Sequence, residues 1–203
     1  TFGGSEFGFG HGFADCTGSG CNEVSITMAS GSASTNGAFQ GSSSSYSILM
    51  ASTANDGTSG TIDMQGTVSS TSSDGFTVTF DQDNIGNYVT YTAYKIDGDV
   101  DVGHFTTPTS TGTQSITTGF EPEYINVITQ PVMTGMDTTS TADYGGWAHG
   151  WATKNDQVAM GVGMYHNNID DHVYSSSSGQ IIDMVEDNNK GGIDKRIDAS
   201  VQS

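Results

Sequence analysis

Hydrophobic residues recur at every second position in many short stretches of this chain. Residues 24–28, 62–68, 76–80 and 158–164 show the strictest alternation of apolar and polar side chains. Successive side chains of a strand point to opposite faces of a sheet, so this period predicts strands with one buried face. The less regular stretches that we also expect to be strands are 47–50, 88–94, 100–105, 114–117, 124–130, 180–185 and 197–201.

Turn-forming residues separate these stretches. Residues 55–57, 73–75 and 97–99 combine Asp or Asn with Gly, which is typical of tight turns, and we expect the last to close a hairpin. No stretch shows the 3.6-residue period of an amphipathic helix. The long polar stretches that we predict to be loops are 31–45, 134–144 and 166–171.

One heptapeptide occurs twice. Gly-Phe-Gly-His-Gly-Phe-Ala at residues 8–14 returns as Gly-Trp-Ala-His-Gly-Trp-Ala at 146–152, so His11 and His149 are equivalent. Further downstream, two runs of four Ser are each followed by similar apolar residues, at 42–50 and 175–184. A self-match of this length indicates one supersecondary unit written twice.

The fold class follows from these patterns. Only 33% of the residues are hydrophobic, and two facing sheets need only one apolar residue in two along each strand. We predict an all-β protein, an antiparallel β-sandwich or jelly-roll-like fold with an internal duplication. The first module is expected at 1–105 and the second, a partial repeat packed against the first or sharing strands with it, at 106–203. The Thr/Pro/Gly-rich residues 106–113 form the expected linker.

The repeated heptapeptide holds the first candidate site. Two equivalent histidines suit a metal site, but the other three His residues share no ligand spacing with them, so a structural role is favoured. The aromatic neighbours suit either a sugar-binding platform or a core, and we favour the core. The residues of this repeat element are Phe9, His11, Phe13, Trp147, His149 and Trp151.

Two other clusters carry chemistry. Cys16 and Cys21 are the only cysteines and lie close enough in sequence for a local disulfide, which is favoured over a metal site that would need two more ligands. Asp97, Asp99 and Asp101 alternate like the start of a calcium loop, but the Gly and Glu of that loop are missing downstream. Solvated turn acids are favoured. We therefore expect no cofactor, with loosely bound Ca, Mg, Na or K ions at the acidic turns as the alternative.

The charge of the chain is extreme, with 23 acidic against 5 basic residues and a net charge of −18. Such a surface repels nucleic acid and anionic membranes, so neither is an expected partner. Its self-repulsion opposes folding in dilute buffer, whereas molar salt shortens the screening length to about 3 Å. The composition thus favours a halophilic protein over an ordinary acidic secreted one. No secretory signal and no apolar stretch long enough for a membrane span are visible.

No enzyme motif is recognisable in the sequence. A nucleophile elbow, a phosphate-binding loop and a dinucleotide-binding glycine pattern are all missing, and acid pairs suited to glycoside cleavage carry no information in a chain this acidic. We therefore expect a protein that is not an enzyme.

Several short motifs resemble a β-rich module of structural proteins from tailed viruses. They are an Asp-Gly-Phe-Thr strand at 74–77, a Tyr-x-Ala strand at 91–93, a Gly-Phe-x-Pro turn at 119–122 and His-Gly-Trp-Ala at 149–152. With the salt-adapted surface, the resemblance implies a virion protein of a virus of halophilic archaea, in head decoration, turret, tail or fibre. It implies no catalytic residues.

The expected partners are copies of the same chain and other virion proteins, with a host glycan or surface layer as a further contact. The expected location is the virion. A secreted halophilic adhesin or glycan-binding module is the alternative function, and a glycoside hydrolase ranks third. Since unpaired strand edges favour aggregation, the second copy is expected to complete its sheets with the middle of the chain or with another subunit.

Overall fold

The computed structural model is built from strands. It describes residues 7–17, 20–30, 38–53, 60–84, 88–130, 136–142, 144–165, 172–187 and 193–201. The strands are β1 (Phe7–Asp15), β2 (Asn22–Ser30), β3 (Ala38–Ser43), β4 (Ile48–Thr53), β5 (Gly60–Thr71), β6 (Phe76–Asp83), β7 (Tyr124–Thr129), β8 (Thr139–Ala142), β9 (Tyr144–Thr153), β10 (Gln157–Tyr165), β11 (His172–Ser178), β12 (Ile182–Asp187) and β13 (Ile193–Ala199).

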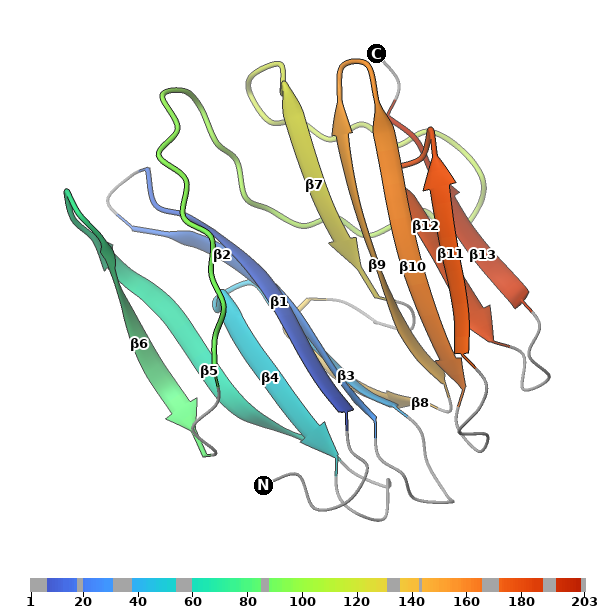
Figure 1. Cartoon of the computed structure of the whole chain (residues 1–203), viewed down its shortest axis with the longest axis horizontal. Helices are drawn as coiled ribbons and strands as arrows, with labels where there is room; N and C mark the ends of the chain where they lie inside the picture. Colours follow the sequence, from blue (N-terminus) through green and yellow to red (C-terminus); the bar gives the residue numbers. More distant parts are fainter. Residues whose placement is uncertain are drawn as a thin grey trace.

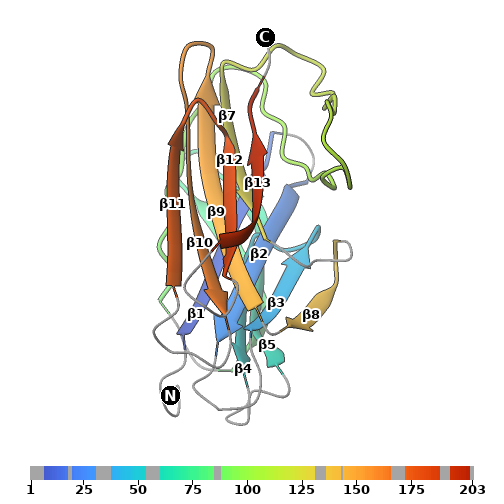
Figure 2. The same cartoon turned by 90° about the vertical axis from the view of Figure 1, so that its right-hand side faces the viewer.

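These strands form four antiparallel sheets arranged as two similar units (Figure 1). In the first unit, the sheet β1-β2-β3-β8 packs against β4-β5-β6. In the second, the sheet β7-β9-β10-β11 packs against the hairpin β12-β13, and Figure 2 shows these two layers side by side. The all-β, antiparallel fold class predicted from the sequence is therefore confirmed.

The two units have the same strand order. In each, a three-stranded meander, β1-β2-β3 or β9-β10-β11, is followed by a hairpin, β4-β5 or β12-β13, that packs on it. This correspondence supports the interpretation that one unit occurs twice. β7 and β8 come from the middle of the chain and complete one sheet each.

Glycines bring the two layers of each unit unusually close. A Cβ atom added to Gly12 of β1 would lie 2.0 Å from the carbonyl oxygen of Ser47, at the start of β4. In the second unit, a Cβ on Gly150 would lie 1.9 Å from the carbonyl oxygen of Ile181, at the start of β12. Both pairs occupy the same place in their units, so the repeated Gly keeps room for the backbone of the hairpin.

Buried polar groups also tie the layers of the first unit together. The Glu23 carboxylate on β2 accepts hydrogen bonds from the backbone N–H of Ser47 at 2.7 Å and of Val68 at 2.8 Å. The Thr27 hydroxyl donates to the Phe9 carbonyl and accepts from the Ala51 N–H. These bonds satisfy backbone groups that face the interior, where an unpaired N–H is costly.

Apolar contacts are concentrated in two small clusters, one in each unit. The first consists of Ala29, Phe39 and Ala51 with Ile62 packed against it. The second consists of Ala148, Ala152, Ile181, Ile182 and Met184. Such small clusters agree with the low hydrophobic content of the chain.

Three predicted strands are wrong. Residues 88–94, 100–105 and 114–117 form no strand, and the expected hairpin at 97–99 is a bend without paired arms. Their alternating pattern suits a sheet, but the described part of the chain offers them no neighbouring strand to bond with. In Figure 1 this connection runs as an unpaired coil from β6 at one end of the molecule across to β7.

Two predicted loops contain strands. Residues 38–43, within the expected loop 31–45, form β3 and are all buried. Residues 139–142, within the expected loop 134–144, form β8, and Tyr144 begins β9. Ser and Gly suggested loops, but here they are strand residues because β2 and β8 lie on either side of β3. The expected loop 166–171 lies outside the described residues.

The predicted module boundary between 105 and 106 stays a prediction. β8 lies beyond residue 106 and yet pairs with β3, so the expected second module lends a strand to the first. Cys16 and Cys21 are bonded to each other just after β1. The ring is small, so on the chain-entropy model it contributes under about 3 kcal/mol.

Candidate functional site: an aromatic seam between the two units

The two copies of the heptapeptide meet. Strands β1 and β9 alternate small residues, which face their own hairpin, with Phe, Trp and His residues, which face away from it. The Phe9 and Trp147 rings stack at 5.0 Å and 15° between planes, and the His11 and His149 rings meet edge to face at 5.1 Å. The repeat element predicted from the sequence is thus brought together in space.

The contacts extend along both strands. His11 lies 5.1 Å from Phe13 and 6.1 Å from Phe9, and His149 lies 5.6 Å from Trp151, measured between ring centroids. Aromatic pairs in such tilted or stacked geometries stabilise by about 0.5–1.5 kcal/mol beyond their buried area. We call this array of Phe9, His11, Phe13, Trp147, His149 and Trp151 the aromatic seam.

Burial disfavours the charged form of both histidines. Burial lowers the pKa of His11 from 6.5, and the charge of His149 lowers it further. Burial also lowers the pKa of His149. Nε2 of His149 lies 2.7 Å from Oδ1 of Asn126 on β7; because an amide oxygen only accepts, this nitrogen is the donor. The bond fixes the tautomer and the orientation of the ring.

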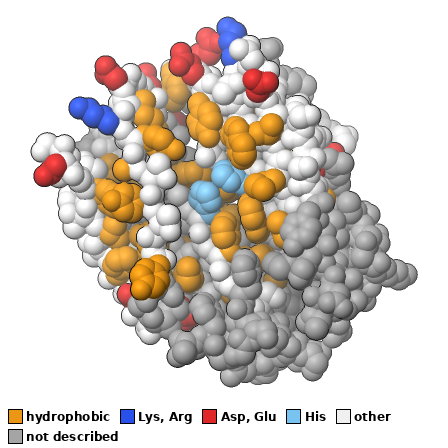
Figure 3. Space-filling model, in the orientation of Figure 1, with side chains coloured by type: hydrophobic (Ala, Val, Ile, Leu, Met, Phe, Trp, Pro, Cys, Tyr) orange, Lys and Arg blue, Asp and Glu red, His pale blue; other side chains and the backbone are white. Residues whose placement is uncertain are grey.

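The seam is half buried rather than part of the core. Trp151 is 39% exposed, and Met160, which pairs with His149 across β9 and β10, is also exposed. Figure 3 shows two adjoining histidines surrounded by hydrophobic side chains on one face of the molecule. The aromatic residues therefore pack against each other, as expected of a core. At the edge of the seam, however, Trp151 reaches the surface.

Among the described residues, no group of three His, Cys, Asp or Glu side chains is placed to hold a metal ion. His104 lines a cavity elsewhere, while His166 and the side chain of His172 lie outside the described part. Asp97, Asp99 and Asp101 are exposed and do not converge on a common centre.

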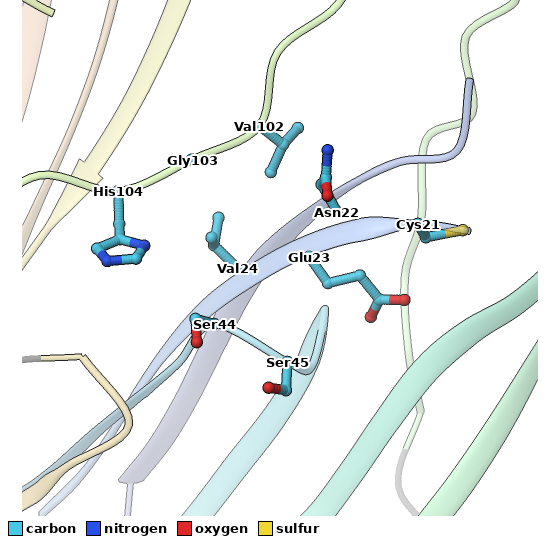
Figure 4. Close-up of a pocket in the computed structure, with 9 residues that line it drawn as sticks. All are labelled: Cys21, Asn22, Glu23, Val24, Ser44, Ser45, Val102, Gly103 and His104. Atoms are coloured by element: carbon cyan, nitrogen blue, oxygen red, sulfur yellow. The ribbon is translucent and has the colours of Figure 1, made fainter. Parts of the chain in front are cut away.

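A hollow lies beside the start of β2 (Figure 4). Its volume is about 400 Å³, and it is lined by Cys21, Asn22, Glu23, Val24, Ser44, Ser45, Val102, Gly103 and His104. The Glu23 carboxylate is occupied by its two backbone bonds. Of the other lining residues, Ser44 donates its hydroxyl to the Asp137 carboxylate, and the charge of His104 acts on the same carboxylate.

Asp137 closes the neighbouring loop. Its carboxylate accepts from the Ser44 N–H at 2.7 Å, from the Ser44 hydroxyl at 2.6 Å and from the Ser43 hydroxyl at 3.4 Å. The bonds from Ser44 lower the pKa of Asp137. This carboxylate therefore links the turn at 136–137 to the end of β3, which is a structural role.

The most exposed hydrophobic residues lie in the connection between the units. Tyr88 is 100% exposed, Tyr91 69% and Tyr94 80%, and Ile96, Phe105 and Ile116 are also exposed. Among the residues that the structure describes, one ring contact involves this connection, an edge-to-face contact of Tyr91 with Phe76 on β6. Tyr and Thr alternate in residues 88–94, and this alternation predicted a half-buried strand. The structure shows an exposed segment outside the strands instead.

The part of the chain that the structure describes includes no helix that could span a membrane. Comparison of the chain with protein-family models, with curated proteins and with solved structures finds no match. The function is therefore inferred from the chain's own residues and their geometry.

Proposed function

We propose that the protein is a non-enzymatic structural component of the particle of a virus that infects an extreme halophile, and that it works as a multimer. Its place is in head decoration, a turret, or a tail or fibre. The proposal combines the short viral motifs of the sequence, a β-rich fold and a surface suited to molar salt.

The observation that carries the multimer is the exposed aromatic segment. Residues 88–94 place three tyrosines in solvent within seven residues, and no strand of the described chain covers them. Soluble monomers rarely expose concentrated apolar surface without a binding partner. A structural protein that packs against neighbouring copies supplies that cover.

The first experiment measures the mass of the protein in molar NaCl by size-exclusion chromatography with light scattering. A multimer of fixed size or a growing assembly is expected. A monodisperse monomer over the accessible concentration range would contradict the proposal.

The second experiment locates the chain. Cryo-electron microscopy of purified particles from a culture that carries the gene should show density with two four-stranded sheets, one packed on a three-stranded sheet and the other on a hairpin. If the particles lack this density and mass spectrometry detects no copy of the protein in them, the proposed role in the virion is wrong.

A glycan-binding module is the second candidate, and the rim of the seam favours it. Trp151 and Asn126 are exposed register partners on β9 and β7, so a flat indole lies beside an amide that both donates and accepts hydrogen bonds. This combination suits the ring and hydroxyls of a sugar. Calorimetric titration with host polysaccharide should then show saturable binding that Trp151→Ala abolishes, whereas no heat from wild type would exclude it.

A further inference from the structure

We propose that the aromatic seam is a pH-sensitive contact that opens in acid and lets β1 and β9 separate, while each unit keeps its own fold. The inference goes beyond the proposed function, because it concerns how the two units of one chain hold together. It rests on the place of the two histidines in the seam and on the side chains around them.

The seam joins the first unit to the second through matched ring contacts. Phe9 and His11 belong to β1, and their ring partners Trp147 and His149 belong to β9. The histidines lie in the middle of both strands, next to the stacked pair. A change of charge on the histidines therefore acts directly on the contact between the units.

Other contacts hold the units together near the start of β9. β8, which ends at Ala142 just before β9, forms a ladder with β3. Gln130, directly after β7, donates its amide to the Thr27 carbonyl on β2 at 2.7 Å. Gly145 of β9 lies against Ala38 of β3. The units therefore stay attached at this end when the seam opens further along the strands.

Among the described residues, the surroundings of His11 contain no carboxylate. Its ring lies near Phe9 and Phe13 along β1, and its register partner on β2 is Ile26. The charge that acts on the pKa of His11 is that of His149. Although the chain has 23 acidic residues, the described part places none of them where it would neutralise a protonated His11.

The described surroundings of His149 are uncharged as well. Its register partners are Ile128 on β7 and Met160 on β10, and its ring also contacts Trp151. Nε2 of His149 donates to Oδ1 of Asn126 at 2.7 Å, so an added proton goes to Nδ1 and leaves this bond intact. The bond holds the ring of His149 on the second unit, so relief of a repulsion requires His11 to move away.

Acid converts the contact between the histidines into a repulsion. As the pH falls below 6.5, the two imidazoles gain protons and carry like charges, with their ring centroids 5.1 Å apart. Like charges in a half-buried place repel more strongly than in water. Separation of β1 from β9 relieves this repulsion and hydrates both rings. Gly12 and Gly150 meet their hairpins on the opposite faces of these strands, so the packing within each unit is kept.

Tryptophan emission tests the opening, because both tryptophans of the chain, Trp147 and Trp151, belong to the seam. In molar NaCl, a change from roughly pH 8 to roughly pH 5, the range in which histidine gains its charge, should shift the emission to longer wavelength and increase its quenching by acrylamide. The far-UV circular dichroism should stay unchanged, and return to the higher pH should restore the emission. Constant emission and quenching, or loss of the strand signal in step with them, would overturn the inference.

Three variants separate the effect of charge from that of packing. His11→Gln gains no charge, so its emission should be the same at both pH values. His11→Glu places a carboxylate beside protonated His149, and this pair should keep the seam closed in acid. His104→Gln, outside the seam, is the control and should open like wild type. Opening of His11→Gln to the extent of wild type would overturn the inference.

Small-angle X-ray scattering measures the opening without the tryptophans, whose emission a nearby imidazolium also quenches. Opening should increase the radius of gyration of wild type in acid and leave that of His11→Gln unchanged. Size-exclusion chromatography with light scattering, coupled to the measurement, ensures that species of equal mass are compared. The same radius of gyration for wild type at both pH values would overturn the inference, whatever the emission shows.

Discussion

At the scale of single residues, the His and Gly of the repeated heptapeptide have two different structural roles. His11 and His149 meet each other, whereas Gly12 and Gly150 leave room for their hairpins. In each unit, one face of β1 or β9 therefore makes ring contacts, and the other face lies close to the backbone of the hairpin. The two roles alternate along β1 and β9 because successive side chains of a strand alternate in direction.

The first prediction concerns acid. The folded pKa values of His11 and His149 lie below the ordinary 6.5, so the unfolded chain binds more protons just below that pH. The free energy of unfolding should therefore fall as the pH drops below about 6.5 and level off below the folded pKa values. Denaturant unfolding at a series of pH values measures this.

The double variant His11→Gln, His149→Gln should lose this slope, because neither amide titrates. His104→Gln, outside the seam, should keep it. An identical pH profile for wild type and the double variant would refute the assignment.

The second prediction concerns the paired glycines. Gly12→Ala and Gly150→Ala each place a Cβ about where a hairpin carbonyl already lies, so each should destabilise by about 1–3 kcal/mol or more. Thermal unfolding in molar salt measures the loss. Gly75→Ala, whose Cβ meets nothing within 4 Å, should be near neutral. Similar losses at Gly75 and at Gly12 would show that the contact is not responsible.

At the scale of elements, side chains of β2 hold the hairpin by its backbone. Glu23 bonds one N–H at the start of β4 and another on β5, and Thr27 bridges β1 and β4. Polar groups thus perform a task that a larger apolar core performs in less acidic proteins. Where β1 faces β4, the layers lie too close for a large side chain, which explains Gly10 and Gly12 of β1.

The third prediction tests this attachment. Glu23→Ala leaves two interior N–H groups without an acceptor and should cost roughly 3 kcal/mol of unfolding free energy. Glu23→Gln keeps one acceptor oxygen and should lose about half as much. Asn22→Ala, an exposed neighbour, should change stability by less than about 0.5 kcal/mol. Urea titrations measure these changes in unfolding free energy. An unchanged stability of Glu23→Ala would contradict the role of Glu23 in holding the hairpin.

At the scale of the whole molecule, charge sets the conditions for folding. A net charge of −18 with five basic residues leaves most carboxylates without a cationic partner. Their repulsion favours the expanded chain until salt screens it.

The fourth prediction follows from this charge. The melting temperature should rise from dilute buffer to molar NaCl, by about 2–4 °C for each kcal/mol of repulsion removed. The triple variant Asp97→Asn, Asp99→Asn, Asp101→Asn carries three fewer charges and should need less salt to reach the same melting temperature. A melting temperature independent of salt would contradict the halophilic interpretation.

The sequence predicted the all-β class well because alternation depends only on local geometry. Strands such as β6 and β10 stand out because one of their faces is apolar. The equivalence of His11 and His149 was also visible, since a repeat is a property of the chain itself. Their direct contact was not visible, because it depends on how two units 138 residues apart pack together.

The errors share one physical cause. β3 and β8 read as loops because their Ser and Gly residues lack a hydrophobic face, yet neighbouring strands pair with them. Residues 88–94 read as a strand because their pattern is right, yet no described strand lies beside them.

The sequence by itself determined the strand-rich class, the repeat, the acidic surface and the residues of the seam. Only the tertiary structure decided which stretches become strands, where the seam lies and which aromatic residues remain exposed. The physical reason is that a strand is stabilised by hydrogen bonds to its neighbours, so its formation depends on residues far away in the chain.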